Sequence, residues 1–128
     1  MVAKIAGIEE AIVEALKMEL TIAHVEAFPD QPRDYNLMHN KGAVLVAYKG
    51  REKELVSDCG LGCSNYEFVV SFLFRNLRVR EGHAGIYEAL ELAEDALNGI
   101  AELQNERFVN FDNGVWEYSQ LYMVNKIG

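Results

Sequence analysis

One stretch, residues 66–74, constrains the fold more than any other part of the chain. It contains three phenylalanines and two adjacent valines, with neither glycine nor proline. Aromatic and β-branched residues are the types that fit a pleated, packed strand, which argues against the alternative of a buried helix. Because side chains alternate along a strand, Val69 and Leu73 share one face, and five large residues share the other: Tyr66, Phe68, Val70, Phe72 and Phe74. A strand apolar on both faces lies inside a sheet and is covered on both sides, by helices, a second sheet or another subunit.

Two amphipathic helices are predicted, one before and one after this strand. Over residues 5–20, apolar side chains recur at spacings of three and four, at Ile5, Ile8, Ile12, Leu16 and Leu20. Over residues 83–98, the same spacing runs through Ile86, Leu90, Ala93 and Leu97 and on to Ile100, and the acidic residues Glu88, Glu91, Glu94 and Asp95 form the polar side. Gly99 is a suitable terminator for the second helix. Each helix therefore has one apolar face to pack on a sheet.

Further strands are predicted around the second helix. Residues 42–48 form a strand that is apolar on both faces, residues 49–51 form a turn, and residues 52–57 can pair as a short strand. Residues 59–64 are expected to form a flexible loop. The chain ends in a hairpin, because residues 106–111 and 115–124 flank Asp112, Asn113 and Gly114, which suit a tight turn with a left-handed residue. In its second strand, Trp116, Tyr118, Tyr122 and Val124 share a face.

The order of these elements predicts the fold class. A helix, two or three strands, a second helix and two strands indicate an α+β fold, with a mainly antiparallel sheet of four to five strands and two helices packed on it. With 128 residues, the chain is expected to form one domain over residues 1–128.

Residues 26–42 are expected to form a long connection between the first helix and the strand at 42–48. They contain both prolines of the protein, Pro29 and Pro32, and each disfavours helix at the residue before it. A loop of this length in a small domain is uncommon and often functional. It also carries four large apolar residues that need a surface to pack on: Phe28, Tyr35, Leu37 and Met38.

Composition excludes several classes of function. The formal net charge is −8, and no cluster of lysine and arginine of the kind used for nucleic acid is visible, so we expect no sequence-specific binding to nucleic acid. No stretch approaches the ~20 apolar residues needed to span a membrane, so no membrane partner is expected. The N-terminal residues lack the pattern of a signal peptide, which predicts a cytosolic protein with reduced thiols.

Cys59 and Cys63 are the strongest candidates for chemistry. A zinc site needs four ligands, usually as two close pairs, and His24, His39 and His83 are far apart in sequence. A redox dithiol usually has two residues between its cysteines at the start of a helix, whereas this pair has three and lies among glycines. We therefore read the cysteines as incidental loop residues, with a thiol redox protein as the less favoured alternative.

No other pattern predicts an enzyme. The chain lacks G-x-S-x-G, a P-loop and G-x-G-x-x-G. Paired carboxylates such as Glu9 with Glu10, and Glu94 with Asp95, lie on polar helix faces, where solvation explains them. No catalytic residue, cofactor or metal is predicted.

Several motifs together resemble a small phage protein family encoded among the tail genes of Mu-like phages and prophages. They are FPDQPRDY at 28–35 with His39, GAVLV at 42–46, YEFVV at 66–70, Arg75 with Leu77, His83 to Tyr87, Glu106 to Phe108, and Gly114 to Tyr118. Each motif is weakly specific alone. Their order and spacing cover most of the chain.

The resemblance implies a tail terminator or neck component that caps the tail tube and joins it to the head. It implies a ring of copies of the chain, commonly a hexamer, with the tail tube protein and head–tail connector proteins as further partners. It also implies location in the bacterial host cytoplasm during assembly and then in the virion tail or neck. The interface residues expected are Phe28, Tyr35 and Met38 in the 26–42 connection, and Trp116 and Tyr118 in the hairpin. The alternative function is a cytosolic small-ligand or regulatory binding domain with its pocket under that connection.

Overall fold

The computed structural model of the protein describes residues 4–21, 23–35, 37, 42–55, 62–78 and 85–127. Along the chain, the elements are α1 (Lys4–Glu19), β1 (Ala23–Ala27), the short 3-10 helix η1 (Pro32–Asp34), β2 (Gly42–Leu55), β3 (Gly62–Phe74), α2 (Ile86–Ala96), β4 (Glu102–Asp112) and β5 (Val115–Ile127). The five strands form one sheet, and only the pairing of β1 with β2 is parallel. The predicted α+β class and the order of helices and strands are confirmed.

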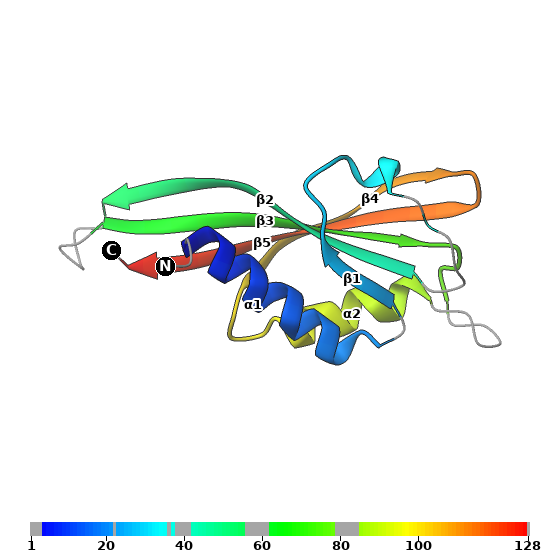
Figure 1. The fold of residues 1–128 in the computed structure, drawn as a ribbon, viewed down its shortest axis with the longest axis horizontal. Helices are drawn as coiled ribbons and strands as arrows, with labels where there is room; N and C mark the ends of the chain where they lie inside the picture. Colours follow the sequence, from blue (N-terminus) through cyan, green and yellow to red (C-terminus); the bar gives the residue numbers. More distant parts are fainter. Residues whose placement is uncertain are drawn as a thin grey trace.

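The central position of β3 agrees with its two apolar faces. The strand order is β1-β2-β3-β5-β4, so β3 has two neighbours on each side. Both helices lie on the same face of the sheet (Figure 1). The five residues predicted to share a face of β3 are all buried there: Tyr66, Phe68, Val70, Phe72 and Phe74. They form the centre of the hydrophobic core.

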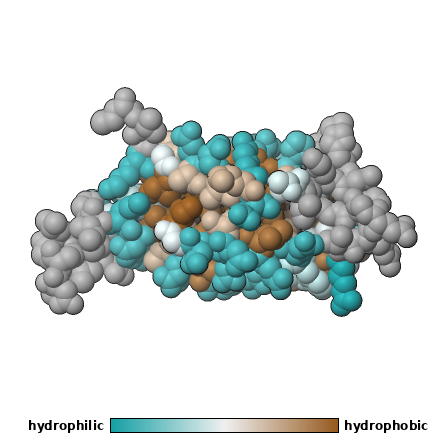
Figure 2. Space-filling model, turned by 90° about the horizontal axis from the view of Figure 1, so that it is seen from below, coloured by the Kyte–Doolittle hydropathy of each residue, from teal (hydrophilic) through white to brown (hydrophobic). Residues whose placement is uncertain are grey.

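The two helices supply the other half of this core. From α1, Ile8, Ile12 and Leu16 are buried, and from α2 the buried residues are Ile86, Ala89, Leu90 and Ala93. The predicted stripes are therefore correct except at Ile100, which is exposed in the turn after α2, because the helix ends at Ala96 and not at the expected residue 98. Residues 83 and 84 of the expected helix lie outside the described part. Gly99 follows α2 with φ of 89°, a left-handed conformation that glycine adopts without strain. Figure 2 shows the helix-covered face, where apolar side chains form a band bordered by hydrophilic ones.

Strand β1 corrects the prediction that residues 26–42 are one connection from the first helix. Residues 23–27 pair in parallel with residues 42–46 of β2, and Val25 is buried in the core while Ala23 is partly buried against it. The strand has a single β-branched residue and is short, so its residue pattern only weakly indicates a strand. Neighbouring parallel strands need a crossover of a dozen or more residues, which explains the length of the chain between β1 and β2.

Strand β2 corrects the turn that was predicted at residues 49–51. Tyr48 pairs with Phe68 and Gly50 pairs with Glu67, so Lys49 is an extra residue, a β-bulge within one continuous strand. The expected short strand at 52–57 is the second half of β2, of which residues up to Leu55 are described. Residues 62–64 of the loop expected at 59–64 belong to β3, which begins at Gly62, and residues 59–61 lie outside the described part.

Among the described residues, those that cover the second face of the sheet lie at one end of it. There, Phe28, Tyr35 and Leu37 from the crossover pack on a small cluster of Ala43, Leu45 and Leu73. The helices are both on the other face (Figure 1). The expectation that β3 is covered on both sides is therefore met fully on one face and in part on the other. Val69, Leu121 and Met123 on this second face stay partly exposed.

The C-terminal hairpin has the predicted turn. Asn113 and Gly114 connect β4 to β5 with φ values of 52° and 74°, both in the left-handed region. A two-residue turn with both central residues left-handed matches the twist of the strands that it joins. The prediction of a tight turn at residues 112–114 is confirmed.

Candidate functional site

Five aromatic side chains meet on the helix-covered side of the β4–β5 hairpin, beside the start of α2. We call this group, formed by Tyr87, Phe108, Phe111, Trp116 and Tyr118, the hairpin aromatic surface. The Phe111 and Trp116 ring centroids are 4.2 Å apart, and Phe108 lies 5.5 Å from Tyr118 and 6.2 Å from Trp116. Tyr87 contacts Tyr118 edge to face at 6.4 Å. Such tilted and edge-on pairs are the favoured geometries of aromatic rings.

A β-bulge brings Phe108 and Phe111 to the same face. The two residues are three positions apart, so a regular strand would point them to opposite faces. Phe108 pairs with Tyr118 and Asn110 pairs with Glu117, which leaves Val109 as the extra residue. The bulge shifts the alternation by one residue and turns Phe111 toward Trp116. Bulges commonly redirect a side chain in this way.

The hairpin aromatic surface is uncovered. Phe108 is 51% exposed and Phe111 49%, and Tyr87 is exposed as well. Trp116 and Tyr118, by contrast, are partly buried against the core. Burial raises the pKa of the Tyr118 hydroxyl, and the nearby Tyr87 hydroxyl raises that pKa further. The surface therefore has a fixed, half-buried inner row and an exposed outer row.

The expected interface residues divide between two places. Trp116 and Tyr118 lie together in the hairpin aromatic surface. Phe28 and Tyr35 also contact each other, with ring centroids 5.3 Å apart, but they lie on the opposite face of the sheet. Met38 lies outside the described residues. The structure thus forms two separate surfaces from these residues, and the sequence prediction had missed Tyr87, Phe108 and Phe111.

Phe28 and Tyr35 mainly complete the small second core. Both are partly buried against it. Burial raises the pKa of the Tyr35 hydroxyl, with additional contributions from the charge of Glu26 and a hydrogen bond to it. A cavity of about 300 Å³ lies between this segment and the end of the hairpin. Tyr35, Arg75 and Glu117 are among its lining residues, and Arg75 donates a hydrogen bond of 2.9 Å to the carbonyl of Leu37. This is the place of the pocket in the alternative, ligand-binding hypothesis.

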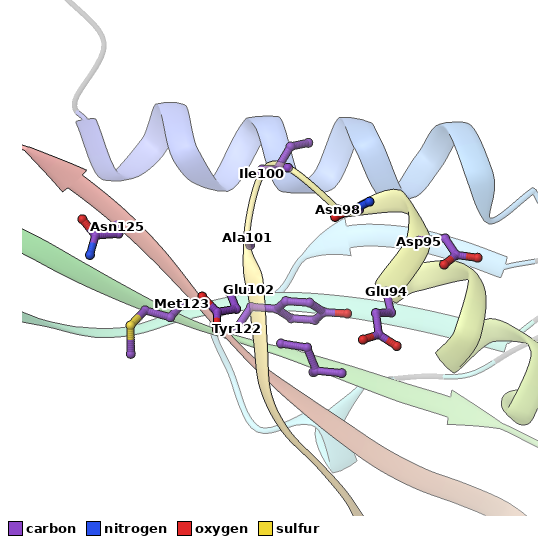
Figure 3. A pocket seen from close by; sticks show the side chains of 11 residues that line it. Glu94, Asp95, Asn98, Ile100, Ala101, Glu102, Tyr122, Met123 and Asn125 are labelled. Atoms are coloured by element: carbon purple, nitrogen blue, oxygen red, sulfur yellow. The ribbon is translucent and has the colours of Figure 1, made fainter.

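A second, larger pocket of about 730 Å³ lies where the turn after α2 leads into β4 (Figure 3). Three carboxylates line it, those of Glu94, Asp95 and Glu102. Tyr122 also lines the pocket, and the hydroxyl end of its ring points toward Glu94 (Figure 3). Burial raises the pKa of the Tyr122 hydroxyl far above its usual range, and the charges of Glu94 and Glu106 add to that rise. The hydroxyl is therefore a neutral donor at physiological pH.

The Tyr122 hydroxyl belongs to a polar network centred on Gln120, which is fully buried. Tyr122 donates a hydrogen bond of 2.6 Å to Oε1 of Gln120. The Nε2 of Gln120 donates to the carbonyl of Leu90 at 3.0 Å and to Oε1 of Glu106 at 2.7 Å. Because these three partners come from β5, α2 and β4, Gln120 ties the edge strand to the helix above it. Its full set of partners explains how an amide is tolerated in the core.

The side chains of both cysteines lie outside the described part of the structure. Cys63 is the second residue of β3, paired opposite Glu54 and Ile127, and Cys59 lies outside the described residues. Among the residues that the structure describes, no group of three or more His, Cys, Asp or Glu side chains is placed to hold a metal ion.

We expect replacement of Cys59 and Cys63 by serine to leave folding nearly intact. Loss of an incidental contact costs under ~0.5 kcal/mol. Thermal unfolding and metal analysis of the purified protein check this. Stoichiometric zinc, or a melting temperature lowered by more than ~10 °C, which for a chain of this length corresponds to about 2–3 kcal/mol, would show that the cysteines have a structural role.

A family model described as Gp37 protein matches residues 12–126, which include most of α1, α2 and nearly the whole sheet. Comparison with curated proteins finds no match. Within the described ranges, neither helix is long and apolar enough to cross a membrane.

Proposed function

The chain belongs to the Gp37 family of phage proteins, and from this premise we propose that it is a structural assembly protein, a tail terminator or neck component that caps the tail tube and joins it to the head. In this role it assembles as a ring of copies, with six expected from the family resemblance. It contacts the tail tube protein on one side and the head–tail connector on the other. It acts in the bacterial host cytoplasm during assembly and stays in the tail or neck of the virion.

The observation that carries this proposal is the hairpin aromatic surface. Exposed Phe108 and Phe111 rest on the half-buried rings of Trp116 and Tyr118. Aromatic residues are enriched at the centres of protein interfaces, where they contribute a large share of the binding energy. A cluster of rings beside a sheet edge is therefore suited to a protein partner.

The charge of the chain is compatible with this role. A net charge of −8 disfavours attachment to phosphate groups, which suits a passage that DNA must cross without binding. We propose no enzymatic activity and no cofactor, because the role requires only assembly.

The experiment is the imaging of tails made with and without this protein. We expect tails made without it to have variable lengths and to fail to join heads. Resupplying the wild-type chain, or Glu91→Ala as a control on the exposed side of α2, should restore uniform tails. Phe111→Ser, which alters the exposed aromatic row, should not restore them. Uniform tails that join heads in the absence of the protein would overturn the terminator assignment.

A small-ligand or regulatory binding domain is the second candidate function, favoured by the cavity of about 300 Å³ beside Tyr35 and Arg75. Its measurement is the thermal stability of the protein in the presence of small polar metabolites, because a ligand that binds only the folded state raises the unfolding temperature.

A further inference from the structure

We propose that copies of this chain join head to tail through the two edge strands of the described sheet: β4 of one copy pairs with β1 of the next. In this contact, Phe108 and Phe111 of the hairpin aromatic surface pack against the C-terminal end of α1 of the next copy, where Met18 is exposed. The inference rests on the proposed ring and names the surfaces that build it.

The first argument is the direction of the strands. β1 runs parallel to β2, whereas each later neighbour along the order β2-β3-β5-β4 is antiparallel to the one before it. The two edge strands, β1 and β4, therefore run in opposite directions. When a second copy is placed beside the first in the same orientation, β4 meets β1 as an antiparallel pair. Such addition uses two different edges of each copy, as a head-to-tail ring requires.

The second argument is the alternation of side chains across the junction. Arg107 points to the face away from the helices, since it pairs with Ser119 and that row continues through Ser71 to Leu45. Glu26 of β1 pairs with Leu45 and points to the same face. A register that places Arg107 opposite Glu26 of the next copy joins opposite charges across the two strands, which is favourable. Both side chains are exposed in the single copy.

The same register brings apolar residues together on the helix-covered side. With Arg107 opposite Glu26, Phe108 comes opposite Val25, which faces the helices. Because the pairing is antiparallel, the residues that follow Phe108 on β4 lie beside the start of β1 of the next copy. Beyond it lies the C-terminal end of α1, which precedes β1 in the chain. Phe111 then approaches Met18, which is 79% exposed and the most exposed large apolar residue of the described chain. Contacts between methionine sulfur and an aromatic ring are favourable.

The bulges on β4 are consistent with a short ladder at this edge. They lie at Gln104 and Val109 and leave residues 105–108 as a regular segment between them. That segment is close in length to β1, residues 23–27. Bulges and charges on an edge strand limit indiscriminate pairing with other strands. Here they leave a defined segment for one specific neighbour.

The test is cross-linking between copies that carry single cysteines, in a background of Cys59→Ser and Cys63→Ser. Met18→Cys and Phe111→Cys proteins are mixed at millimolar concentration with a short bismaleimide. We expect a covalent dimer in the mixture and far less in either protein alone. The matched control is Glu91→Cys in place of Met18→Cys, which should give no dimer with Phe111→Cys. Dimers from the Phe111→Cys protein alone would indicate symmetric packing and would overturn the proposal. A dimer yield in the mixture no higher than in the control would overturn it as well.

A charge exchange provides the second measurement. Arg107→Glu should reduce the Met18–Phe111 cross-link severalfold, and the same change combined with Glu26→Arg should restore it. Failure of the pair to restore the cross-link would reject the register. These results are separate from the role in tails. If tails require the protein but the cross-link is absent, the proposed contact is wrong and the proposed function is supported. If the cross-link forms but tails are normal without the protein, the contact is supported and the proposed function is wrong.

Discussion

Phe72→Ala is expected to lower the free energy of unfolding by about 3–5 kcal/mol, the usual cost of truncating a fully buried aromatic side chain. Phe72 lies on β3 between Val44 of β2 and Tyr118 of β5, on the face that both helices cover. Its side chain is fully buried. Truncation removes the ring contacts and leaves a cavity that the strands on both sides cannot close, because backbone pairing holds them in place.

Denaturant unfolding measures this effect. Glu91→Ala is the matched control, because Glu91 is exposed on the polar side of α2. Its midpoint should stay close to that of the wild-type protein, since surface substitutions usually change stability by less than ~0.5 kcal/mol. Similar midpoints for the two variants would mean that β3 is not the centre of the core.

Gln120→Leu is expected to destabilise the protein by about 1–3 kcal/mol for each buried partner that loses its hydrogen bond. Leucine has a similar size, so the loss comes mainly from hydrogen bonding and not from a cavity. The buried partners are the Tyr122 hydroxyl and the Leu90 carbonyl, which contact Gln120 at 2.6 and 3.0 Å. The exposed Glu106 carboxylate would also lose its contact of 2.7 Å, at a smaller cost because water can replace it. We also expect β4 to loosen, because Gln120 connects that strand to α2 through Leu90.

Amide hydrogen exchange of β4, together with denaturant unfolding, tests this prediction. Gln104→Leu is the control, because Gln104 lies exposed at a bulge of the same edge strand and donates only a long hydrogen bond of 3.4 Å to Glu102. It should leave exchange in β4 nearly unchanged. If Gln120→Leu is as stable as the wild-type protein, the network is not a stabilising link between the strand and the helix.

The candidate site was predicted in part. Trp116 and Tyr118 were identified because they recur at the strand period on a face that also holds Tyr122. Phe108 and Phe111 were not grouped with them, because a spacing of three places residues on opposite faces of a regular strand. The available signal was the Asn-Gly turn, since pairing outward from it places Phe111 opposite Trp116. The bulge at Val109 that then keeps Phe108 on the same face has no recognisable signature in the sequence.

Residue patterns along the chain are sufficient to identify the elements whose signal is local and strong. The period of the apolar residues identifies both helices and the central strand, and Asn113 with Gly114 specifies the turn of the hairpin. Three features are visible only in the folded chain: the parallel pairing of β1, the bulges at Lys49, Gln104 and Val109, and the burial of Gln120. Each of these features depends on partners distant in the chain. Strand β1 is held by its pairing with β2, and the bulges are set by the register with neighbouring strands. Gln120 is held by hydrogen bonds to groups from β5, α2 and β4. Local preference carries little information about such contacts, because their energy arises only when the sheet has formed.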